Sequence, residues 1–156
     1  MKKYLFVLLM FFCITSAYSQ SWSSTHHDED PMKKMEAYDS FSFTDSDGNM
    51  FVFWSNSPKN FRIISNESLF NYNINSRWVE LEIGFYDENG KFVKKIRTNG
   101  RADDDEPSRL ENMSFTKGSK EIISYIKEQK GSIRFLVPLY GSASGMDFTV
   151  PCMKNE

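Results

Sequence analysis

Both histidines of the chain lie in the stretch THHDEDPM, where His26 and His27 are followed by Asp28, Glu29 and Asp30. Imidazole and carboxylate groups can bind zinc or move protons, so this cluster is the first candidate for chemistry. A zinc site needs three or four ligands on a rigid frame, and the chain has no third histidine and no cysteine nearby. Adjacent residues of an extended chain also point to opposite sides. We therefore expect no dedicated metal site, no cofactor and no catalytic residue here.

The segment that precedes this cluster has the pattern of a secretory signal peptide. Lys2 and Lys3 come before an apolar stretch at residues 4–14, and Ala17 and Ser19 are spaced as in a small-residue cleavage site. The apolar stretch is too short to span a bilayer as a stable helix. The pattern predicts cleavage near Ser19 and a periplasmic or secreted protein.

The two cysteines do not predict a disulfide. Cys13 lies within the expected signal peptide, and Phe12 stands where a lipoprotein signal needs a small residue, so no lipid anchor is expected. Cleavage would leave Cys152 as the only thiol of the exported chain. A buried, inert thiol is the main interpretation, and pairing with another molecule is the alternative.

Charge and hydropathy exclude two classes of partner. Without Lys2 and Lys3 the chain has 17 basic and 21 acidic residues, a net charge of −4. A mildly acidic chain does not favour nucleic acid or anionic membrane surfaces. No apolar run after the signal peptide is long enough for a transmembrane helix.

The elements that would position functional residues are short strands. Residues 20–36 are polar and predict a tether, and residues 37–156 predict a single domain. Within that domain, alternating apolar and polar residues indicate strands, and the segment 119–130 has the period of one α-helix. No βαβ alternation occurs. The pattern predicts a mainly β protein, an antiparallel β-sandwich of about seven to nine short strands with one helix.

Four aromatic residues could form a binding surface. Trp78 falls on the polar face of the clearest strand, and exposed aromatic side chains on a sheet can stack on a sugar or contact a peptide. Trp54, Tyr86 and Tyr140 complete the candidate set. The alternative is that other elements cover these rings and that they only pack.

The stretch IISYIKEQKGSIRFLVPLYGSASGMDFTV at residues 122–150, together with Trp22 ahead of DPMKKM, resembles a broad group of small exported bacterial β-domain proteins. That group includes accessory proteins of type VI secretion and invasion-associated proteins. The resemblance implies an exported β-sandwich without known catalysis, and it implies no site residue. The chain departs from the group's pattern because it lacks paired cysteines and ends shortly after the last strand.

The first expectation for function is therefore an exported, non-enzymatic envelope accessory or interaction protein that binds a protein partner. A carbohydrate- or peptide-binding module with an aromatic platform is the second hypothesis. A small hydrolase with carboxylates dispersed along the sequence is the third, since distant residues can meet in space. A platform needs clustered aromatic rings, a hydrolase needs converging titratable groups, and an interaction protein needs an apolar patch or an open sheet edge.

Overall fold

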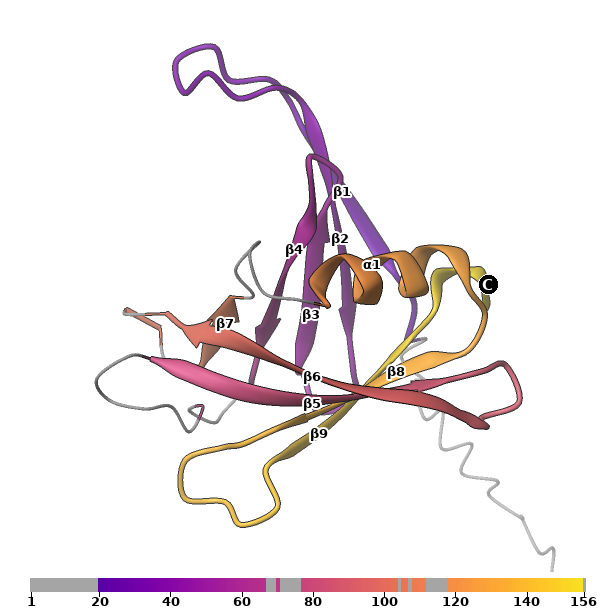
Figure 1. The fold of residues 1–156 in the computed structure, drawn as a ribbon. Coiled ribbons are helices and arrows are strands. Elements are labelled where there is room, and N and C mark those ends of the chain that lie inside the picture. The colour runs from indigo at the N-terminus through magenta and orange to yellow at the C-terminus, as the bar shows by residue number, and fades with distance from the viewer. Residues whose placement is uncertain are drawn as a thin grey trace, which may run out of the picture.

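The computed structural model describes residues 20–66, 70, 77–103, 105–106, 108–111 and 118–155. The expected signal peptide and Cys13 lie outside the described residues. In this part of the chain, nine strands and one α-helix form the fold (Figure 1). The first strands are β1 (Ser23–His27), β2 (Tyr38–Thr44), β3 (Met50–Trp54), β4 (Ser57–Ile64), β5 (Trp78–Tyr86), β6 (Phe92–Ala102) and β7 (Arg109–Glu111). They are followed by α1 (Ser119–Glu128), β8 (Ser132–Val137), β9 (Met146–Pro151) and the 3₁₀ turn η1 (Met153–Asn155).

All nine strands belong to one antiparallel sheet in the order β1-β2-β3-β4-β7-β6-β5-β8-β9. Figure 1 shows that β1 to β4 cross β5, β6, β8 and β9 at a steep angle, so the sheet folds over and its two halves form two layers. Aromatic contacts join the layers: Phe51 of β3 lies 5.4 Å from Phe135 of β8, between ring centroids. Phe43 of β2 lies 6.4 Å from Phe148 of β9. Such crossed packing of two sheet layers is one of the two common sandwich geometries.

The core between these layers is built mainly from phenylalanine and β-branched residues. Several strands contribute alternate residues, and β5 shows the pattern most clearly, with four buried residues separated by half-buried or exposed ones. The buried residues of β5 are Val79, Leu81, Ile83 and Phe85. Helix α1 lies against the sheet and adds Ile122, Ile123 and Ile126 to the same core.

The structure confirms a mainly β, antiparallel sandwich, with nine strands and one helix in the residues that it describes. A single folded sheet, rather than two separate sheets, supplies both layers. The helix ends at Glu128, two residues before the predicted end, because Gln129 already has an extended backbone. Among the described residues, no helix has the length and apolar character needed to cross a membrane.

The segment expected to be a polar tether, residues 20–36, is different in the structure. Ser23–His27 is strand β1 and pairs with β2 through five consecutive residues. Asp30 and Met35 form a further bridge in the connection between the two strands. The ordered sheet therefore begins before residue 37. The sequence of β1 has no apolar alternation, because this strand lies at the edge of the sheet and its side chains are mostly exposed.

Candidate binding surfaces

Strand β1 is one of the two ends of the sheet. On one side it pairs with β2, from Ser23 opposite Ser42 to His27 opposite Tyr38. On its other side no strand lies among the described residues. The other end of the sheet is β9, whose one partner strand in the described part of the chain is β8. Each end presents backbone N–H and C=O groups that are not used within the sheet.

Trp22 fixes the start of β1 to the body of the protein. Its indole Nε1 donates a hydrogen bond of 3.0 Å to the backbone oxygen of Pro151 at the end of β9. Its ring lies 5.7 Å from Phe53 and 5.8 Å from Phe43, between centroids. This residue therefore joins the two edge strands at one point and covers the core between them. Strand β1 is thus anchored by the residue that directly precedes it.

The two histidines of β1 point to opposite faces, as the alternation of a strand predicts. His26 Nδ1 lies 2.7 Å from Oδ1 of Asp39, and this hydrogen bond is the main reason that the pKa of His26 is raised above its usual value. The His27 ring stacks on Tyr38 at 4.5 Å between centroids, and its Nε2 lies 2.9 Å from the hydroxyl of Ser40. Each imidazole is thus engaged with its own cross-strand neighbour. The described residues contain no group of three or more His, Cys, Asp and Glu side chains placed to hold a metal ion.

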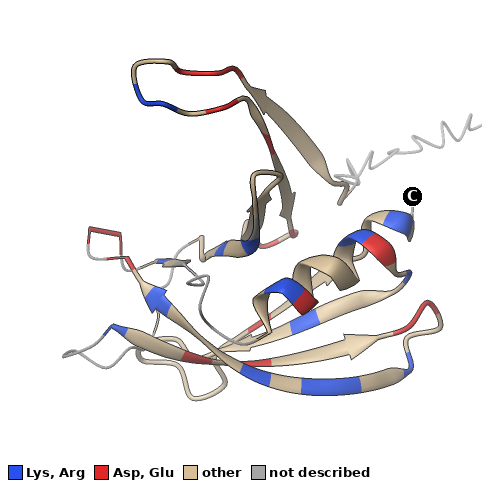
Figure 2. Cartoon of the chain, turned by 45° about the horizontal axis from the view of Figure 1, so that its top comes forward, with Lys and Arg blue, Asp and Glu red and all other residues tan. Residues whose placement is uncertain are grey.

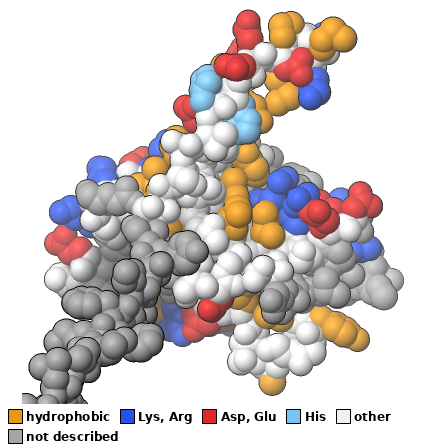
Figure 3. All heavy atoms as spheres, turned by 180° about the vertical axis from the view of Figure 1, so that it is seen from behind, with side chains coloured by type: hydrophobic (Ala, Val, Ile, Leu, Met, Phe, Trp, Pro, Cys, Tyr) orange, Lys and Arg blue, Asp and Glu red, His pale blue; other side chains and the backbone are white. Residues whose placement is uncertain are grey.

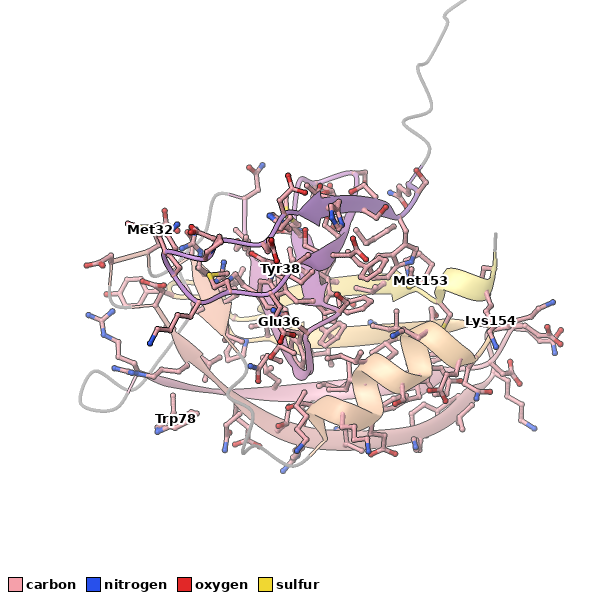
Figure 4. All side chains as sticks on the ribbon, turned by 90° about the horizontal axis from the view of Figure 1, so that it is seen from above. Met32, Glu36, Tyr38, Trp78, Met153 and Lys154 are labelled. Atoms are coloured by element: carbon pink, nitrogen blue, oxygen red, sulfur yellow. The ribbon has the colours of Figure 1, made fainter. Side chains whose placement is uncertain are left out.

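The connection between β1 and β2 extends from the body as an arm, residues 28–37 (Figure 1). Its turn is organised by Asp30, whose Oδ1 accepts hydrogen bonds from the backbone N–H groups of Met32 and Lys33. The side chain of Met32 at the tip is 94% exposed. Figure 3 shows apolar and charged side chains together at this tip, with the two histidines lower on the arm. In Figure 4, seen from above, Met32 lies at the far end of the arm from Tyr38.

The four aromatic residues of the predicted binding surface do not form one platform. Trp54 is in the β1–β4 layer, where the Arg62 guanidinium carbon lies 5.2 Å from its ring centroid. Trp78 and Tyr86 are both on β5 but stand eight residues apart, about 27 Å along an extended strand. Tyr140 is 77% exposed in the loop between β8 and β9.

Of these four, Tyr86 is mainly a packing residue. Its ring lies in edge contact with Phe92, at 5.8 Å between centroids. It also covers Gly84, where an added Cβ would approach the ring to 3.0 Å. Figure 4 shows Trp78 on the outside of β5, pointing away from the core. Tyr140 is thus the most exposed member of the set, and the other three are half-buried.

A pocket of about 300 Å³ lies where the loop at residues 138–145 folds over the outer face of β5 and β8. Glu80 and Glu82 line it from β5, Leu136 from β8, and Ser142 and Ser144 from the loop, with Val137, Pro138, Ala143 and Gly145 completing the wall. Gly145 allows this approach, because it has a positive φ of 69° and an added Cβ would lie 2.6 Å from the backbone oxygen of Val137. Sequence reasoning missed this pocket. No local pattern indicates it, because its walls come from segments more than 50 residues apart in the chain.

Ion pairs hold the acidic side of this pocket in place. Glu82 contacts Lys95 Nζ at 2.6 Å and Arg97 at 2.7 Å, and these hydrogen bonds, with that from Lys95 the largest, lower the pKa of Glu82. Arg97 Nε lies 3.7 Å from Glu80. Figure 2 shows acidic and basic residues interleaved over these strands. A carboxyl group with a lowered pKa is a poor general acid at neutral pH, so this arrangement suits binding better than proton transfer.

Cys152 is buried, and its thiol lies 3.6 Å from the backbone oxygen of Tyr125. Burial raises the pKa of this thiol to about 11. A thiol in this state is a poor nucleophile and a poor metal ligand at neutral pH. This surrounding agrees with the interpretation of Cys152 as a packing residue.

Comparison of the chain with protein-family models, with curated proteins and with solved structures found no match.

Proposed function

We propose that this protein is an exported, non-enzymatic binding protein that takes up an extended segment of a protein partner at the open edge of β1. The observation that carries the proposal is the anchored edge strand. β1 ends the sheet, is paired on one side only within the described chain, and is fixed at its start by Trp22. Strand addition to such an edge is a common way for a domain to bind a peptide, because the main-chain hydrogen bonds supply affinity.

The sequence of β1 supports this proposal because the strand lacks the usual protection of an edge. Natural proteins discourage unwanted pairing with charged side chains, prolines or bulges on edge strands. β1 reads Ser-Ser-Thr-His-His, without Lys, Arg, Asp, Glu or Pro, and its register with β2 is unbroken. The edge of β9 is better protected, since it carries Asp147, paired with Arg134 at 2.7 Å, and ends in Pro151.

Export and the absence of catalysis belong to the same proposal. Support for export comes from the signal-peptide pattern of residues 1–19. Support for binding rather than catalysis comes from the histidines and from Glu82, which are all engaged with neighbouring side chains. The similarity to small exported bacterial β-domain proteins stays a prediction of the same kind.

The test is capture of the partner by chains that differ only at an edge. The bait is the chain from Gln20 to Glu156, produced as wild type, as Thr25→Lys on β1 and as Thr149→Lys on β9. Both threonines are exposed, so each substitution places the same charge on one edge of the sheet. We expect a protein captured from the native envelope by the wild type and by Thr149→Lys to be lost with Thr25→Lys.

The position of binding is then measured by hydrogen exchange of the complex. New protection at Ser23–His27 is the expected result, because an added strand would hydrogen-bond the amides of β1 that point away from β2. A partner that Thr25→Lys captures as well as the wild type does would refute the proposal. A captured glycan without protein would refute it as well.

A further inference from the structure

The pocket under the loop at residues 138–145 has a balanced local charge. Its two carboxylates, Glu80 and Glu82, are matched by Lys95 and Arg97, which contact them from β6. The four charges sum to zero, so net charge favours neither an anion nor a cation. The site does present fixed hydrogen-bonding groups, because a carboxylate has about four acceptor positions and Glu82 shares its oxygens with two cations among the described residues.

The loop adds hydroxyl groups to the opposite wall of this pocket. The Ser142 hydroxyl accepts a hydrogen bond of 3.1 Å from the backbone N–H of Gly145, and it lies 3.4 Å from the hydroxyl of Ser144. A hydroxyl that accepts in this way still has a proton to donate and a second lone pair. The pocket therefore offers carboxylate acceptors on one wall and groups that both donate and accept on the other.

Apolar surface lies within and beside this polar frame. Leu136 is 38% exposed at the pocket, and Pro138 lines it from the start of the loop. Trp78, two residues before Glu80 on the outer face of β5, is half-buried and does not line the pocket, although Figure 4 shows it on the outside of the strand. Apolar C–H groups beside hydrogen-bonding groups suit a ligand that has both hydroxyl groups and C–H faces.

From these features we infer that the pocket binds one ring of a neutral sugar. The carboxylates and serine hydroxyls would meet the sugar hydroxyl groups, and Leu136 with Pro138 would meet its C–H face. The volume of about 300 Å³ lies at the lower end of the range of about 300–1,000 Å³ found for small-molecule sites, which fits a single ring. This site is separate from the β1 edge, since it lies on the outer face of the other layer, so either function can fail without the other.

The experiment is an NMR titration of the uniformly ¹⁵N-labelled chain from Gln20 to Glu156. The probes are glucose, galactose, mannose and N-acetylglucosamine as neutral sugars, with glucosamine as a cation and glucuronate as an anion. Each is added to about 50 mM, well above the millimolar dissociation constants at the weak end of the affinity scale. We expect at least one neutral sugar to shift amides at residues 78–82 and 136–145, and to shift them more than either charged sugar does.

A matched pair of variants tests the role of the carboxylate. Glu80→Ala removes an acceptor at the pocket, and Glu128→Ala removes an exposed glutamate from α1. We expect Glu80→Ala to weaken binding about fivefold or more and Glu128→Ala to leave it unchanged. The inference is overturned if none of the four neutral sugars shifts these amides, if glucosamine or glucuronate binds more tightly, or if the shifts lie outside the pocket.

Discussion

Replacing Trp22 with alanine removes the side chain that anchors the open edge. The indole contacts three buried phenylalanines, Phe43, Phe51 and Phe53, at 5.7–6.3 Å between ring centroids. It also makes the 3.0 Å hydrogen bond to Pro151. Truncation of a large core aromatic residue costs about 3–5 kcal/mol, and Trp22 is only half-buried, so the lower end applies. We expect Trp22→Ala to lower the free energy of unfolding by about 3 kcal/mol, equivalent to about 10 °C in Tm for a chain of this size.

Trp22→Phe is the matched control, because it keeps an aromatic ring against the core and removes the Nε1 donor. A net hydrogen bond is worth about 0.5–1.5 kcal/mol, so this variant should lose about 1 kcal/mol plus a smaller packing term. Urea unfolding followed by far-ultraviolet circular dichroism measures both variants without relying on tryptophan fluorescence. A loss below about 0.5 kcal/mol for Trp22→Ala would refute the reasoning, because that is the effect of an ordinary surface substitution. Residues 20–36 would then behave as the tether that their composition predicts.

Three further predictions concern other parts of the structure. Burial raises the pKa of Cys152 to about 11, so this thiol should react with a thiol reagent at pH 8 only after the protein unfolds. Reaction in the folded protein at the rate of a free thiol would contradict the buried position of Cys152. Gly131→Ala should lower the free energy of unfolding by about 3 kcal/mol or more, because φ at Gly131 is 117° and the added Cβ would lie 2.1 Å from the backbone oxygen of Tyr86. A Tm within 2–3 °C of wild type would count against this packing. His26 should titrate by NMR above its usual pKa of 6.5, chiefly through its hydrogen bond to Asp39, and Asp39→Asn should bring the midpoint down. Because the pKa of His26 is raised in the folded protein, the His26–Asp39 pair stabilises the fold fully below pH 6.5, and this stabilisation is lost as the pH rises through that raised pKa. An unchanged midpoint in Asp39→Asn would show that the pair does not form.

The sequence predicted those parts of the fold in which local chemistry and burial agree. The turns at residues 45–49 and 87–90 follow from their own Asp and Gly residues: φ is 82° at Gly48 and 73° at Gly90, and Oδ1 of the leading aspartate accepts hydrogen bonds from two backbone N–H groups in each turn. β5 alternates as predicted because one of its faces lies on the core. Residues 119–128 form the helix because their apolar residues recur at helical spacing.

What could not be predicted depends on contacts between distant segments. β1 has no apolar alternation, and only the pairing with β2 and the contact of Trp22 with β9 order it. The pocket needs the loop at residues 138–145 to reach β5, more than 50 residues earlier in the chain. The folding of one sheet into two layers is likewise set by long-range aromatic contacts such as Phe51 with Phe135, which no local pattern reports.

Hydrogen exchange of the five amides of β1, Ser23–His27, tests the central claim most directly. In the isolated chain from Gln20 to Glu156, the amides that point to β2 should exchange slowly and the alternate amides should exchange fast, because only one side of β1 is paired. In the complex with a captured partner, the alternate amides should become protected as well. Fast exchange of all five amides in the isolated chain, or protection by the partner elsewhere but not at β1, would contradict the account.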